Sequence, residues 1–98
     1  MRMTVREAKP LVLTCMADAA KMHGVRVTEI LMRGRRDEVV KARQDAMLFA
    51  SDKGVSSVNI GMHMDRDHST VLHGIARARQ RHEGRAKEPI FKSVRSAQ

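Results

Sequence analysis

The sequence has very few aromatic residues: two Phe and neither Trp nor Tyr among 98 residues. β-Sandwiches and barrels rely on aromatic and β-branched strands, so these classes are not expected. The single cysteine, Cys15, excludes an internal disulfide and favours a reducing compartment. No apolar run approaches the roughly 20 residues that cross a bilayer, and no signal-peptide pattern opens the chain. We therefore expect one cytoplasmic domain that does not contact a membrane.

Positive charge is in excess, with 19 Lys and Arg against 11 Asp and Glu and a net charge of +8. Hydrophobic residues still make up 42% of the chain, which is a globular balance. In so small a domain this excess favours a polyanionic partner, because neutralising phosphates releases condensed counterions. A basic surface without such a partner is the other interpretation.

Apolar residues recur at helical spacing, so we expect an all-α fold, a compact bundle of about five to six helices. Pro10 can open the first helix at its first position, and Gly24 ends it. Thr28 is a good N-cap for a short second helix that turns Ile30 and Leu31 inward.

The second half of the chain predicts three further elements. A helix begins at Asp37–Glu38, where the helix dipole favours negative charge, and runs to about Ser51. A short helical piece spans 56–64, Asp65–Arg66 forms a tight turn, and Asp67 caps a last helix that Gly84 stops. The expected buried face of that helix consists of Val71, Leu72, Ile75 and Ala78.

A short helix, a tight turn and a longer helix with polar residues at its start are typical of a helix-turn-helix. In this motif the second helix enters the major groove and reads base edges with its N-terminal residues, here Asp67, His68, Ser69 and Thr70. An acidic side chain near phosphates is costly unless it accepts a specific hydrogen bond, and cytosine N4 is the available donor. A plain N-cap would explain Asp67, but not the polar cluster beside it.

Two stretches, EVVKARQDAM (38–47) and IGMHMDRDHSTVLHG (60–74), resemble the C-terminal DNA-binding domain of the bacterial chromosomal replication initiator DnaA. The core of the match, RDHSTVLH, is long and specific. The resemblance implies a Trp-repressor-like helix-turn-helix fold that binds double-stranded DNA. It divides the chain into an N-terminal tail (1–9), the DNA-binding domain (10–83) and a basic tail (84–98). One short helix is possible in that tail, where the apolar residues Ile90, Phe91 and Val94 could cap the bundle.

The resemblance also implies roles for individual residues. Arg35 falls where the family places an arginine that enters the minor groove, and a narrow A·T-rich groove attracts a guanidinium. Asp67, His68 and Ser69 fall where the family reads base edges in the major groove. The positions that match contacts to the DNA backbone are Arg43, Gln44, Thr70 and His73, and Arg66 matches the basic residue before the recognition helix.

The chain departs from the family pattern at the turn and at the start of the short helix. Asp65 stands where two glycines are common, and Ser57–Val58 stand where an apolar residue and a proline contact thymine methyls. These departures motivate an alternative function, a protein-interaction module that modulates the replication initiator or its regulators without specific DNA binding.

Catalysis and metal binding have no support in the sequence. It contains no G-x-x-x-x-G-K-[ST] phosphate loop and no nucleophile–base pair, so we expect neither an enzyme nor a cofactor. The three histidines His63, His68 and His73 lack metal-ligand spacing, and Cys15 is expected to be a small buried hydrophobe. Arg77, Arg79 and Arg81 are either contacts to the DNA backbone or a solvated face.

The sequence thus predicts a domain that binds initiator-type duplex sites as a monomer and regulates replication initiation or transcription at the nucleoid. Met1 and the basic tail after Gly84 favour a complete small protein over a fragment.

Overall fold

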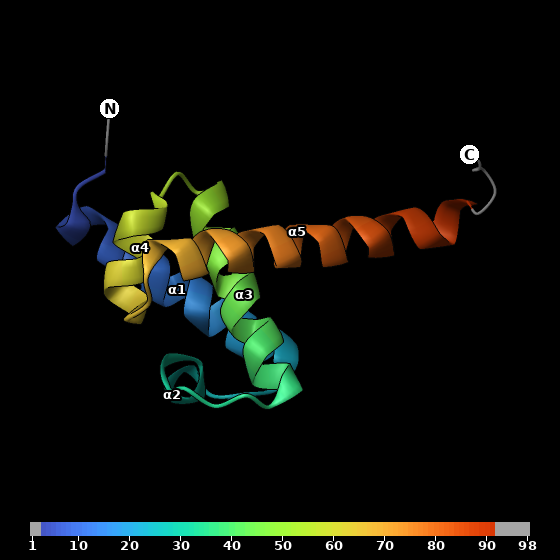
Figure 1. The fold of residues 1–98 in the computed structure, drawn as a ribbon, viewed down its shortest axis with the longest axis horizontal. Coiled ribbons are helices and arrows are strands. Elements are labelled where there is room, and N and C mark those ends of the chain that lie inside the picture. The colour runs from blue at the N-terminus through green and yellow to red at the C-terminus, as the bar shows by residue number, and fades with distance from the viewer. Residues whose placement is uncertain (1–2, 92–98) are drawn as a thin grey trace.

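The computed structural model describes residues 3–91, with side-chain burial up to residue 84. This part of the chain is all-helical, which confirms the predicted fold class (Figure 1). Its five helices are α1 (Val5–His23), α2 (Val27–Leu31), α3 (Asp37–Asp52), α4 (Ser57–Met64) and α5 (His68–Phe91). None of the described helices is long and apolar enough to span a membrane.

Helix α1 begins earlier than expected, and the predicted start at Pro10 is wrong. The Thr4 hydroxyl accepts the Glu7 N–H at 3.1 Å, and the Glu7 carboxylate accepts the Thr4 N–H at 2.9 Å. This capping box satisfies two N–H groups at the true start, so Pro10 lies inside the helix, which lacks one internal bond there. Gly24 ends α1 in the left-handed conformation (φ 67°), as predicted.

The short helix α2 also begins two residues earlier than predicted. The Glu29 carboxylate accepts the Arg26 N–H at 2.8 Å, so the helix begins at Val27 and Thr28 lies within it. Thr28 as N-cap is therefore wrong. Ile30 is buried as expected, whereas Leu31 is exposed.

The signals for α3, α4 and the turn are confirmed. The Ser56 hydroxyl accepts the Asn59 N–H at 3.2 Å at the start of α4. Asp65 adopts the left-handed conformation (φ 56°) that ends α4, and Asp tolerates this region better than most residues. The Asp67 carboxylate accepts the Ser69 N–H at 2.9 Å and caps α5.

Helix α5 continues to Phe91, so the predicted stop at Gly84 is wrong. A glycine inside a helix costs about 1 kcal/mol relative to alanine, which weakens a helix without ending it. Leu72 is 53% exposed, so its predicted burial is also wrong; Gly74 takes its place against α3. Val71 and Ala78 are buried and Ile75 is half-buried. The proposed capping side chains in the C-terminal tail lie outside the residues whose side chains are described.

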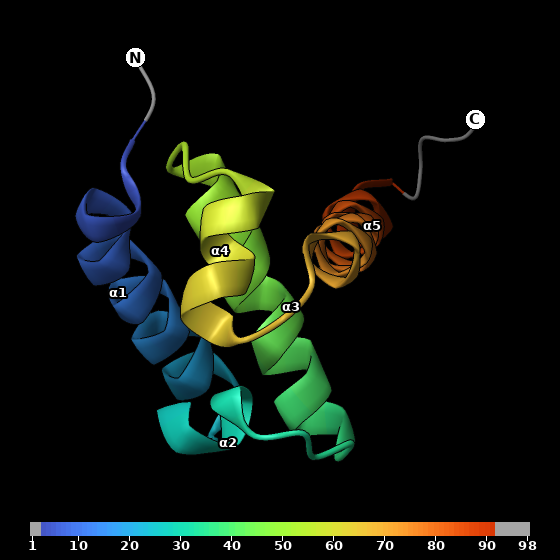
Figure 2. The same cartoon turned by 60° about the vertical axis from the view of Figure 1, so that its left-hand side comes forward.

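Helix α3 is the centre of the bundle and packs against the other four described helices. In Figure 2 α4 lies in front of α3, between α1 and α5. The core is aliphatic and Met-rich, and Cys15 is buried in it as predicted. Gly61 of α4 lies so close to the Arg66 carbonyl that a Cβ would clash with it. Because of this contact, α4 and the turn before α5 are tightly packed, and the helix-turn-helix has a defined shape. The largest fully buried hydrophobic side chains of the whole core are Met16, Ile30, Met47, Ile60, Met64, Val12, Val71 and Cys15.

Candidate nucleic-acid interface

The start of α5 presents a cluster of polar side chains to solvent. Asp67, His68, Ser69 and Thr70 are all exposed, as the reading of base edges requires. Hydrogen bonds from Ser69, through its backbone first and then its hydroxyl, lower the pKa of Asp67 below its ordinary value. Asp67 is therefore ionised at neutral pH and can only accept hydrogen bonds.

Beside this cluster, α3 and α5 enclose a small hollow of about 160 Å³. We call it the α3–α5 hollow. Its apolar wall is Val40, Met47 and Gly74. The polar residues that line it are Arg43, Gln44, Arg66, Thr70 and His73, all of them predicted contacts. Positions scattered over 31 residues of sequence thus meet at one place.

Arg66 also lines a second hollow of about 440 Å³, which connects the turn to the start of α5. Asp67 and His68 lie along it, together with the exposed apolar side chains Val58 and Met62. Arg33 also lines this hollow and was not among the predicted residues, although it belongs to the RGRR run.

Arg43 is engaged inside the protein. Its Nε donates to the Ile30 carbonyl at 2.9 Å, and its Nη2 donates to the Met32 carbonyl at 2.7 Å and the Gly34 carbonyl at 3.3 Å. Burial lowers the pKa of Arg43, and the nearby Arg66 charge lowers it further. Arg43 therefore ties the basic loop, residues 32–36, to α3.

Arg66 also binds the Met32 carbonyl. Its Nη2 donates to the Met32 carbonyl at 2.7 Å, and its Nη1 donates to the Met64 and Asp65 carbonyls, each at 3.0 Å. The basic loop and the turn of the helix-turn-helix are thus joined at one atom. Arg35, in this loop, is exposed, whereas its neighbour Arg36 pairs with Glu29 at 3.1 Å.

A buried carboxylate, Asp45, follows Gln44 on α3. Asp45 has no exposed surface, and its oxygens lie 2.6 Å from His23 Nε2, 2.7 Å from Arg81 Nη2 and 2.9 Å from His82 Nε2. Burial alone would raise the pKa of Asp45, but hydrogen bonds from His23 and His82 and the charge of Arg81 outweigh it and lower the pKa. The sequence reasoning missed this cluster. Its signal was an acidic residue on the apolar stripe between Ala42 and Ala46.

For three arginines of α5 the sequence left open a choice between contacts to the DNA backbone and a solvated face. Their surroundings in the structure differ. Arg79 is exposed and lies 3.4 Å from Asp52. Arg81 is half-buried in the Asp45 cluster and also donates to the side-chain oxygen of Gln44 at 2.9 Å. Arg77 is exposed.

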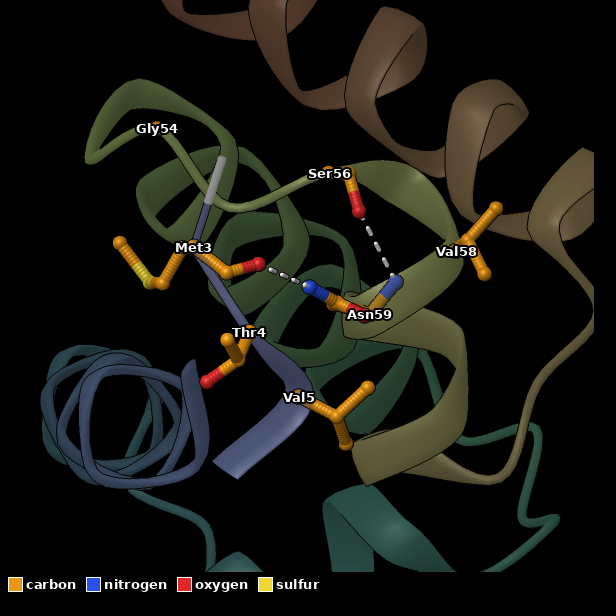
Figure 3. A pocket seen from close by; sticks show the side chains of 7 residues that line it. All are labelled: Met3, Thr4, Val5, Gly54, Ser56, Val58 and Asn59. Carbon is orange, nitrogen blue, oxygen red and sulfur yellow. Dashed lines mark hydrogen bonds between the residues drawn. The ribbon is translucent and has the colours of Figure 1, made fainter. Parts of the chain in front are cut away.

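A larger hollow, of about 630 Å³, lies elsewhere, between the start of α1 and the start of α4 (Figure 3). The Asn59 side-chain amide donates to the Met3 carbonyl at 3.1 Å across it. Its lining contains no charged residue, so it does not suit a phosphate. Among the described residues no three potential ligands gather into a metal site.

Comparison with known proteins identifies the family of this chain. The family model described as the bacterial DnaA protein helix-turn-helix matches residues 16–78, a range that includes every predicted DNA contact. A chromosomal replication initiator protein DnaA from Thermomicrobium roseum is 47% identical over 53 residues, which are 52% of this chain and 11% of that protein. The chain thus spans only a small part of this relative's length, and no solved structure is significantly similar to it. The matched range covers most of the chain and the whole interface, so the chain belongs to the family of bacterial DnaA helix-turn-helix domains.

Proposed function

We propose that this domain recognises a short, asymmetric, initiator-type site on duplex DNA and acts as a monomer. The observation that carries the proposal is the exposure of Asp67, His68, Ser69 and Thr70 beside the α3–α5 hollow. The first three residues would read base edges in the major groove. Thr70, His73 and Gln44 would contact phosphates around the hollow, and such contacts set the register of the protein on the duplex.

The basic loop would supply the second reading element. Arg35 is exposed in a loop joined to the helix-turn-helix turn through the Met32 carbonyl. An arginine at this place would enter the adjacent minor groove, where a narrow A·T-rich segment has an enhanced negative potential. In this proposal Arg43 has a positioning role as well as the predicted contact to the DNA backbone, because two of its hydrogen bonds hold the loop and a third holds the end of α2.

Occupation of such sites would control replication initiation or transcription in the bacterial cytoplasm, at the nucleoid. The domain would do this by binding alone, as a non-catalytic module. The geometry of the turn favours DNA over a protein partner, because Asp65 adopts the left-handed turn conformation that glycines usually supply. The altered turn therefore gives little support to an interaction module that acts on the initiator or its regulators.

The test is a selection of bound duplexes from a random pool, followed by titration of the enriched site and a shuffled version at several salt concentrations. We expect one asymmetric site to be enriched and to bind more tightly than its shuffled version at moderate salt. The logarithm of the affinity should fall linearly with that of the salt concentration, by about 0.9 for each neutralised phosphate. Equal binding of both duplexes, or none, would favour the protein-interaction module.

Two variants separate base reading from general binding. His68→Ala should reduce affinity for the selected site more than for the shuffled one, because His68 is assigned to base edges. Lys9→Ala, which removes an exposed charge on α1, is the matched control and should leave the preference unchanged.

A further inference from the structure

Just beyond the family-matched residues 16–78, α5 continues and still contacts α3 through Arg81 and His82. Arg81 and His82, in this continuation, both bind Oδ1 of the buried Asp45, while His23 binds Oδ2. A buried carboxylate without partners is strongly unfavourable, so these partners are held firmly in place. The cluster therefore fixes the guanidinium of Arg81 at the edge of the α3–α5 hollow.

The other terminal nitrogen of Arg81 acts on a predicted DNA contact. Arg81 Nη1 donates to Gln44 Oε1 at 2.9 Å. Because a guanidinium can only donate hydrogen bonds, the amide oxygen of Gln44 must face Arg81, and the amide NH₂ group must be turned away from it. Gln44 lines the hollow together with Thr70 and His73, so the donor end of its amide is available to an acceptor there.

We propose that Arg81 is a positioning residue for DNA binding, which holds the Gln44 amide with its N–H donors toward a DNA phosphate. This inference rests on the proposed function, because the hollow must receive a phosphate. A glutamine without this partner would sample several rotamers and would also present its oxygen to the phosphate. Ordering such a side chain on binding lowers affinity by about three- to tenfold, which is the expected effect of losing Arg81.

The test is a double-mutant cycle between Arg81→Lys and Gln44→Ala on the selected duplex. Lysine keeps the positive charge beside Asp45, but one ammonium group cannot reproduce the fork that reaches both Asp45 and Gln44. We expect Arg81→Lys to weaken binding about three- to tenfold in the wild-type chain and to have no further effect in the Gln44→Ala chain. Arg79→Lys, on the same helix and exposed, is the matched control and should change little.

A loss of the same factor in both backgrounds, or no loss in the wild-type chain, would overturn the role of Arg81. If the unmodified chain binds no duplex, the proposed function itself fails, which is a different result. Thermal melting monitored by circular dichroism establishes that each variant is folded at the assay temperature. Should Arg81→Lys not fold, Gln44→Glu keeps the acceptor for Arg81 but removes the amide donors. It should bind no better than Gln44→Ala, and wild-type affinity would overturn the proposal.

Discussion

Replacement of Arg43 by lysine separates its two assigned roles, contact with the DNA backbone and support of the basic loop. Lysine keeps the positive charge, but a single ammonium group cannot reach the Ile30 and Met32 carbonyls with the geometry of the guanidinium. The variant therefore loses at least one of the charge-assisted hydrogen bonds that hold the end of α2 and the basic loop. Such a bond contributes about 1.5–3 kcal/mol when buried, and partial exposure of Arg43 reduces this to about 1 kcal/mol.

Without that bond the loop holds Arg35 less precisely, so recognition of the A·T-rich end should weaken. The expected cost in discrimination is about 1 kcal/mol, a factor of about five, within the 1–3 kcal/mol typical of one specific contact. Fluorescence anisotropy titrations of the selected duplex, and of one with its A·T-rich end replaced, would measure it at several salt concentrations. The salt slope should stay unchanged in Arg43→Lys, whereas Arg43→Ala should reduce it by about 0.9.

The control is Arg36→Lys, an exposed change in the same loop that keeps the charge near Glu29. Wild-type discrimination by Arg43→Lys at the A·T-rich end would refute the idea that Arg43 positions the loop. An unchanged salt slope in Arg43→Ala would refute its contact with the DNA backbone.

Four further changes test other parts of the structure. Arg35→Ala should lower affinity by about 1–3 kcal/mol and reduce selectivity at the A·T-rich end, and unchanged selectivity in titrations would contradict the minor-groove role. Asp67→Asn keeps an N-cap, so melting should be nearly unchanged while duplex selection shifts at one base pair; an identical selected site would argue against base reading. The lowered pKa of Asp45 means that its stabilisation is complete above the unfolded pKa of about 3.9 and is lost as pH falls through the lower folded value. In urea unfolding, Asp45→Asn should therefore have a lower free energy of unfolding than wild type at neutral pH, and that free energy should depend less on pH below about 4. An equal dependence on acid pH in both proteins would contradict the stabilising role of the ionised Asp45. Gly61→Ala should cost about 1–3 kcal/mol in urea unfolding because its Cβ would meet the Arg66 carbonyl, whereas Gly34→Ala, with open space, is the control. Equal stability of the two variants would show that the close approach is unimportant.

Local sequence determined the helices of this protein and most of their ends. Gly24, Ser56 and Asp67 act through hydrogen bonds or backbone conformations confined to a few neighbouring residues, and such signals can be recognised along the chain. Helical periodicity placed Val71 and Ala78 of α5 in the core for the same reason, although it was wrong for Leu72. Where two local signals competed, as at Pro10 and the Thr4–Glu7 capping box, the pattern alone was misleading.

Tertiary structure decided how the candidate site is assembled. Arg66 reaches the Met32 carbonyl across 34 positions, and Asp45 meets partners 22 to 37 positions away. No local propensity encodes such contacts, because they depend on which helices pack together. From the sequence alone, charged residues such as Arg43, Asp45 and Arg81 are expected at the surface or in contact with a partner. Only packing around α3 withdraws them from water and turns them into internal supports of the interface.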